Sequence, residues 1–260
     1  MTSRTVGGAL CPDKISADSR SRRKAAPTAE APDAAWLAGL LQAGDSFYPT
    51  GSYAHSFGLE GLVQEGVIRD RLTLRTFLQG SVLPSLRQVE LPLAAHAWTE
   101  LGQENWPAVG ELCRLSAALR APRELRQASE NIGRQRAELA ALLHGHPLAL
   151  EYQRRVAAES WPHAGAVSAA LEGRVLGAPQ VAVLAGLCYS TLSAQVAAAM
   201  KILRLGQNAA QTLLAECLAA APAVIAAAQQ VPVAEIGWFN PWLDVAAARH
   251  ESADARMFIS

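Results

Sequence analysis

The sequence predicts an all-α fold, namely a single bundle-like domain of about eight to ten helices. Beyond residue 33, apolar residues recur at helical spacing, alanine is abundant, and alternating runs of Val, Ile and Thr joined by hairpin turns are missing. Half of the 260 residues are apolar, enough for a substantial buried core. We expect residues 1–33 to be a disordered tail and residues 34–260 to be the domain.

The charge balance and the cysteine pattern limit the classes of function that are open to this protein. The 23 basic and 23 acidic residues cancel, so the field that would attract nucleic acid or an acidic membrane is missing. The four cysteines form no CxxC pair, and no apolar signal segment follows the N-terminal basic residues. These features predict a cytoplasmic protein with reduced thiols. The basic cluster at residues 20–24 is expected to be solvated.

The first ordered elements are read from turn residues. Asp33 is expected to cap a helix that ends at Gly44. Residues 45–55 then predict a structured loop, because Pro49 and Gly51 exclude a continuous helix. Residues 56–66 predict a short helix.

The middle of the chain predicts longer helices. Thr73 is expected to cap one that runs towards Leu101, with kinks or breaks at Pro84 and Pro92. Further helices are predicted over residues 106–119, 122–143 and 162–171. In the second of these, Pro122 suits the first helical position. Its apolar face is expected to consist of Leu125, Ile132, Leu139, Leu142 and Leu143.

Residues 181–200 carry no charge over about the length of a bilayer span. Their alanines, hydroxyls and one glutamine give a weak insertion signal, so we expect a core or dimer-interface helix and no membrane span. Gly206 interrupts the pattern. Residues 209–229 predict another helix, with a kink or break at Pro222.

Motifs for catalysis are missing: there is no Walker A loop, GxSxG, HExxH, or GxGxxG between a strand and a helix. His144 and His146 flank a glycine in what reads as a helix-ending loop, with no further metal ligand nearby in sequence. Ser56 and His55 are adjacent and cannot pair as nucleophile and base. We therefore expect no catalytic residue, no metal ligand and no directly bound cofactor.

The last stretch, residues 239–260, differs from the N-terminal tail. Aromatic, basic and apolar residues continue to its final positions, and Trp242, Met257 and Phe258 would be costly in water. We expect this terminus to dock on its own domain or on a partner.

Three separated motifs resemble the UreF family of urease accessory proteins. The first is DSFYPTGSYAHSFGLE at residues 45–60, called the signature loop below. The second is Leu-Gly-Gln at residues 205–207 with a further glutamine at 211. The third is the tail, with Asn-Pro-Trp-Leu-Asp at 240–244, Arg-His-Glu at 249–251 and Arg-Met-Phe-Ile-Ser at 256–260. Two positions depart from the family pattern: Met257 replaces a leucine, and Leu205 stands where a proline is common.

The resemblance implies a non-enzymatic scaffold that dimerises, binds the accessory protein UreD (also called UreH) and recruits the GTPase UreG for nickel insertion into apo-urease. Nickel and GTP would be handled by those partners, and the scaffold could modulate the GTPase. The partner-binding residues carried over are Tyr48, Pro49, Gly51, Tyr53, His55, Ser56 and Glu60 in the loop, Gly206, Gln207 and Gln211, and Trp242, Arg249, His250, Arg256 and Phe258 in the tail.

Other interpretations of these residues stay open. The loop could simply be a tightly packed turn, and residues 206–211 a helix junction with satisfied amides. The alternative function is a stand-alone helical enzyme or ligand-binding protein that uses the loop between Tyr48 and Glu60.

Overall fold

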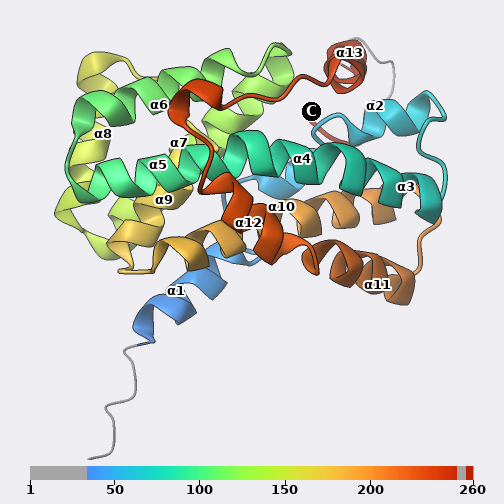
Figure 1. The fold of residues 1–260 in the computed structure, drawn as a ribbon, viewed down its shortest axis with the longest axis horizontal. Coiled ribbons are helices and arrows are strands. Elements are labelled where there is room, and N and C mark those ends of the chain that lie inside the picture. The colour runs from blue at the N-terminus through green and yellow to red at the C-terminus, as the bar shows by residue number, and fades with distance from the viewer. Residues whose placement is uncertain (1–33, 251–255, 260) are drawn as a thin grey trace, which may run out of the picture. The chain divides into compact units, whose positions relative to one another are not determined.

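A computed structural model describes residues 34–250 and 256–259. All regular secondary structure in these residues is helical, which confirms the all-α prediction (Figure 1). Residues 34–260 form one compact unit. Asp33, Cys11 and the basic cluster at 20–24 lie outside the described residues, so the predicted tail stays a prediction. The N-cap of α1 is Ala34, one position after the predicted Asp33.

The helices follow one another along the chain in this order. They are α1 (Ala35–Gly44), the 3-10 turn η1 (Ser52–Ala54), α2 (Leu59–Gln64), α3 (Arg71–Phe77), α4 (Leu83–Ser85), α5 (Leu91–Gly102), α6 (Trp106–Ala118), α7 (Arg123–His144), α8 (Pro147–Glu159), α9 (Gly165–Val175), α10 (Gln180–Ile202), α11 (Gln207–Leu218), α12 (Ala221–Ala228), η4 (Val233–Glu235) and α13 (Pro241–His250). Helix α8 was not predicted. The His-Gly-His-Pro stretch before it reads as a loop, yet the His146 side chain accepts the Leu148 N–H and caps the new helix.

Helices α3, α4 and α5 follow one another along a single line in Figure 1. Kinks or breaks were predicted at Pro84 and Pro92. The helix does not break there: two π-helical segments, Leu78–Val82 and Leu86–Glu90, each lead into an α segment with a proline in its first turn. A proline has no N–H for the ordinary helical bond, and the wider π turn absorbs this defect without ending the helix. The N-cap prediction was also wrong. Asp70 is the cap, and Thr73 is the third helical residue that completes its capping box.

Helix α7 packs against α9 through small residues rather than through the predicted leucines. Its buried residues are Ala128, Ser129, Gly133, Ala137 and Ala140, whereas Leu142 is 78% exposed. A Cβ on Gly133 would lie 2.7 Å from the Ala164 backbone, so the close approach of the helices selects small side chains here. Pro122 is the N-cap of α7, one position before the helix begins.

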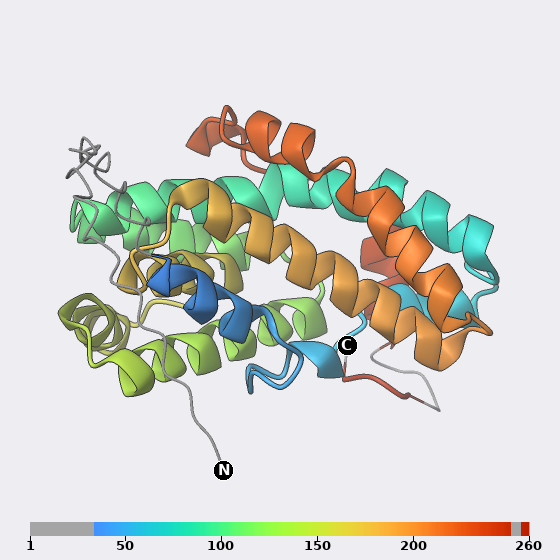
Figure 2. The same ribbon diagram turned by 90° about the horizontal axis from the view of Figure 1, so that it is seen from below.

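Helix α10 lies in the centre of the fold and contacts α1, α2, α5, α9, α11 and α12 (Figure 2). By length and composition alone, Gln180–Ile202 and Gln207–Ala228 are apolar enough to cross a membrane, a test that buried core helices also pass. The second stretch is divided into α11 and α12, with Pro222 in the first turn of α12 as predicted. The three described cysteines are buried and free of disulfides, as expected of core residues.

Candidate functional site

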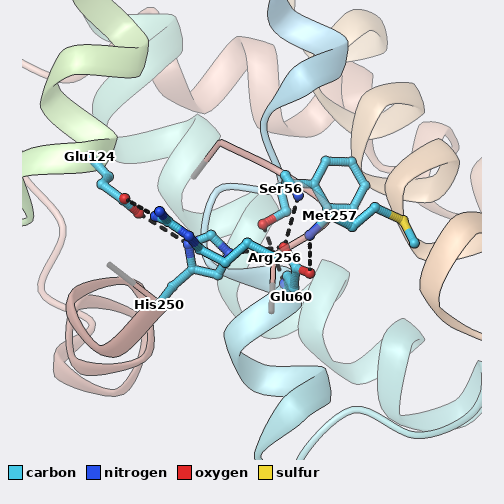
Figure 3. Close-up of polar contacts among 7 residues, drawn as sticks. Ser56, Glu60, Glu124, His250, Arg256 and Met257 are labelled. Atoms are coloured by element: carbon cyan, nitrogen blue, oxygen red, sulfur yellow. Dashed lines mark hydrogen bonds and ion pairs between the residues drawn. The ribbon is translucent and has the colours of Figure 1, made fainter. Parts of the chain in front are cut away.

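The signature loop and the C-terminal tail meet at one buried carboxylate, Glu60 in the first turn of α2 (Figure 3). Glu60 is only 5% exposed. Its Oε1 accepts the Met257 N–H at 2.8 Å, and its Oε2 accepts the Phe258 N–H at 3.0 Å. The same Oε2 lies 2.9 Å from His250 Nε2. One side chain thus binds the last turn of α13 and the backbone of the tail.

His250 bridges two carboxylates that come from distant parts of the chain (Figure 3). Its Nε2 faces Glu60 and its Nδ1 lies 3.0 Å from Glu124 Oε2 on α7. Both contacts are hydrogen bonds from the ring when each nitrogen carries a proton. Arg256 adds a bond of 2.8 Å to Glu124 Oε1. We call Glu60, Glu124, His250, Arg256 and the N–H groups of Met257 and Phe258 the tail latch.

The electrostatics of the latch favour an ionised Glu60. Burial raises the pKa of this carboxyl, but the hydrogen bonds from Met257 N–H, His250 and Phe258 N–H outweigh burial and hold the pKa below its usual value. A buried charge is tolerated only when it is compensated in this way. The latch therefore depends on its full set of donors.

Two glycines let α13 approach α2 closely. A Cβ on Gly61 would lie 2.7 Å from the Ala246 carbonyl oxygen, and one on Gly58 would lie 2.7 Å from Leu243 Cδ1. Gly58 also has φ +86°, a left-handed conformation that favours glycine. The Ser-Phe-Gly-Leu-Glu-Gly run from Ser56 therefore forms the seat on which the tail helix rests.

The predicted tail residues divide into two groups. His250, Arg256 and Phe258 dock on the chain's own domain, where the buried Phe258 ring lies 5.2 Å from Lys201 Nζ and Ile259 N–H donates to the Ala54 carbonyl. Arg249 is exposed and pairs with Glu65 at 2.8 Å. Trp242 points away from the core and is 80% exposed.

The predicted loop residues are mostly internal. Tyr48 is buried and donates its hydroxyl to Glu172, which also pairs with Arg136 at 2.7 Å. Burial, followed by the charge of Glu172, raises the pKa of Tyr48 well above its usual range. Gly51 takes a left-handed conformation with φ +77° at the start of η1. These contacts describe a packed turn that joins α1 to α2.

The remaining loop residues surround the latch. His55 and Ser56 are buried, and Tyr53 is half-buried. Burial lowers the pKa of His55, although the nearby Glu124 opposes the shift. The Ser56 carbonyl accepts Gln195 Nε2 at 3.1 Å, and its hydroxyl accepts the Glu60 N–H at 3.3 Å. Pro49 and Thr50 present their carbonyls to the Gln135 amide at 2.8 Å.

The glutamine motif lies apart from the latch. Gly206 is the N-cap of α11, and the Gln207 and Gln211 side chains are exposed on that helix. Gly206 has φ −72°, so its backbone does not require glycine. Within the described residues, no hydrogen bond joins this motif to the latch.

Sequence reasoning missed the residues on neighbouring helices that complete the site. Glu124 is an acidic residue in the first turn of α7, where it reads as a partner of the helix dipole. Glu172 is a buried charge on the largely apolar α9, and Gln195 is a buried amide in the uncharged stretch 181–200 of α10. A lone polar residue on an apolar face was the available signal for the last two.

The polar groups of the site attach the C-terminal tail to the rest of the chain. The carboxylates of the latch bind donors from their own chain, and no group of three or more His, Cys, Asp or Glu side chains among residues 34–250 and 256–259 is placed to hold a metal ion. The fold and the site together define an all-helical protein whose most organised polar cluster fastens its C-terminal segment to its N-terminal motif.

Comparisons with known proteins agree with this description. A family model described as UreF matches residues 68–218. Urease accessory protein UreF of Azoarcus sp. (strain BH72) is 34% identical over 224 residues, 85% of this chain and 94% of its own. That of Methylibium petroleiphilum (strain ATCC BAA-1232 / LMG 22953 / PM1) is 34% identical over 248 residues, 93% and 99% of the two chains. That of Bacillus sp. (strain TB-90) is 28% identical over 225 residues, 86% and 99%. The chain belongs to the UreF family of urease accessory proteins, which confirms the resemblance.

Proposed function

We propose that this chain is a non-enzymatic cytoplasmic scaffold of urease maturation. It binds a UreD-type (UreH-type) accessory protein and recruits the GTPase UreG, so that nickel is inserted into apo-urease, with nickel and GTP held by the partners. Modulation of the GTPase belongs to the same proposal. Family membership supports the general role, and the exposed surface of α13 supports docking of a protein partner.

The supporting observation is the segment at and just before α13 that exposes Trp238, Phe239, Trp242 and Val245, called the aromatic face below. Phe239 and Trp242 are 81% and 80% exposed, and the other two side chains are also exposed. Exposed aromatic residues gathered in this way are typical of docking surfaces, and Trp is among the residues that contribute most to binding. The latch holds α13 on α2 and leaves this face open to a partner.

The test is capture of the partner after co-expression. We expect the double variant Phe239→Ser/Trp242→Ser to lose capture of the UreD-type protein, with unchanged helical circular dichroism and thermal midpoint. The matched control is Leu142→Ser/Leu150→Ser, which removes two apolar side chains that are 78% and 52% exposed on α7 and α8. Capture that survives the first change, or that is lost equally in both, would contradict the proposal.

A homodimer is the second part of the proposal. Helices α1 and α10 pack against each other, and both expose large apolar side chains: Leu37 and Leu41 on α1, Val181 and Tyr189 on α10. A second copy covering these side chains would remove them from water. Light scattering after size-exclusion chromatography should give twice the chain mass, and Leu41→Glu should give the single mass. A monomeric wild type would refute this part alone.

A further inference from the structure

A cavity of about 230 Å³ lies between the signature loop, the two π-helical segments, α7, α10 and the first turn of α13. Its walls are largely apolar, with Phe57, Phe77, Leu187 and Leu243 among the lining residues. Pockets that bind drug-sized ligands typically measure about 300–1,000 Å³. This cavity is smaller, and its volume suits one long side chain.

Two acceptors without partners belong to residues that line the cavity. Gln195 is 3% exposed and donates Nε2–H to the Ser56 carbonyl, but its Oε1 has no hydrogen-bond partner. Asp244 also lines the cavity, and its carboxylate takes part in no hydrogen bond or ion pair found within the described residues. Leaving a carboxylate unpaired in a part-buried site costs free energy, so Asp244 favours a ligand that supplies a donor.

These two acceptors belong to the same corner of the fold. Gln195 is hydrogen-bonded to the Ser56 carbonyl. Leu243, which precedes Asp244 in the chain, lies against Gly58, two residues after Ser56. Burial raises the pKa of Asp244, as expected for a carboxyl without a counter-charge, although the N-terminal end of α13 offsets part of its charge.

The two arginines that line the cavity are already paired. Arg120 pairs with Glu90 at 2.6 Å, and Arg136 pairs with Glu172 at 2.7 Å. Asp45 is exposed to solvent, and its carboxylate accepts the Phe47 N–H at 2.7 Å. The cavity is therefore left with the half-buried carboxylate of Asp244 and the aromatic side chains of Tyr53, Phe57 and Trp238. This combination is complementary to an organic cation on an apolar stem.

We propose that this cavity receives a lysine or arginine side chain of the protein partner that docks on the aromatic face. Trp238 connects the two surfaces, because it belongs to the aromatic face and also lines the cavity. The cation is neutralised by Asp244 and lies against the aromatic rim. The identity of the occupant as a partner residue rests on the proposed function.

The first experiment tests the ligand chemistry with the full chain alone. In saturation-transfer NMR, n-butylguanidine should bind at least tenfold more tightly than the uncharged isostere n-butylurea. Asp244→Asn should reduce guanidine binding at least tenfold, at an unchanged thermal midpoint. Asp45→Asn, which removes an exposed carboxylate that also lines the cavity, should retain binding. Equal binding of the two probes, or equal losses in both aspartate variants, would overturn the inference.

The second experiment tests the occupant. With the UreD-type protein co-expressed, Asp244→Asn should weaken capture at least tenfold, while Phe239→Ser/Trp242→Ser should abolish capture and leave n-butylguanidine binding intact. If Asp244→Asn abolishes probe binding but leaves capture unchanged, the occupant is not a partner side chain and the inference fails, while the proposed function stands. If the aromatic variant captures the partner normally, the proposed function fails instead.

Discussion

Replacing Glu60 by glutamine should release the tail from the domain. The glutamine has one acceptor oxygen, so at least one of the three donors, Met257 N–H, Phe258 N–H or His250, would face an amide NH₂ group. Hydrogen bonds to a charged group contribute about 1 kcal/mol more than neutral ones, and a buried donor without a partner costs about 1–3 kcal/mol. Two weakened bonds and one lost bond give about 3–5 kcal/mol, similar to the loss of one partner of a buried ion pair.

Detachment of the tail limits this effect, because a released tail no longer contributes strain or unpaired donors. We therefore expect a loss of about 3 kcal/mol in the free energy of unfolding, measured by urea denaturation. Hydrogen exchange of the Met257 and Phe258 amides should accelerate by roughly 100-fold, since local opening at about 3 kcal/mol lower cost has that effect.

The control is Glu65→Gln on the same part of the chain. Glu65 pairs with the exposed Arg249, and an exposed pair of this kind contributes about 0–1 kcal/mol. If Glu60→Gln destabilises the protein no more than Glu65→Gln, or leaves exchange of the tail amides unchanged, the latch does not hold the tail as described.

Three further predictions follow from the same contacts. The pKa of Glu60 in the folded protein is depressed below 4.5, so its contribution to stability is present above pH 4.5 and is lost as the pH falls through that folded pKa. The stability difference between wild type and Glu60→Gln should therefore shrink only below about pH 4.5. A difference that is the same at every pH would contradict this. Gly61→Ala should lower the free energy of unfolding, measured by urea denaturation, by about 1–3 kcal/mol, because its Cβ would meet the Ala246 carbonyl oxygen. Gly186→Ala, whose Cβ would have no neighbouring atom within 4 Å, should raise the free energy of unfolding by about 0.5–1 kcal/mol. Tyr48→Phe should cost about 1–3 kcal/mol by removing a buried donor to Glu172, and Tyr189→Phe, at an exposed position, should stay within about 0.5 kcal/mol; equal effects would exclude the proposed role of the Tyr48 hydroxyl.

Local patterns were sufficient for the fold class and for most helices, because apolar spacing reports directly on a buried helical face. They failed where a neighbouring helix decides the outcome. The leucines of α7 looked like its buried face, but the close approach of α9 requires Gly133 and the alanines instead. The prolines at 84 and 92 predicted kinks or breaks, and π turns keep the helix continuous.

The candidate site shows the same division between local and long-range information. Glu60 and His250 stand in motifs that could be picked out by eye, yet nothing local indicates that residues so far apart in sequence share a hydrogen bond. Glu124 belongs to no motif and completes the latch from a third segment. Two possible destinations for the tail, its own domain or a partner, were equally compatible with its composition. The structure assigns Phe258 to the first and leaves Trp242 free for the second.

The way Glu60 holds the tail has a consequence for how the sequence there can vary. Its carboxylate accepts hydrogen bonds from the backbone N–H groups of residues 257 and 258, and the Met257 side chain is 60% exposed to solvent. Methionine in place of the family's leucine is therefore a neutral exchange, since any residue with an N–H supplies the same donor. Proline is the exception: at either position it would take away the hydrogen that the carboxylate needs.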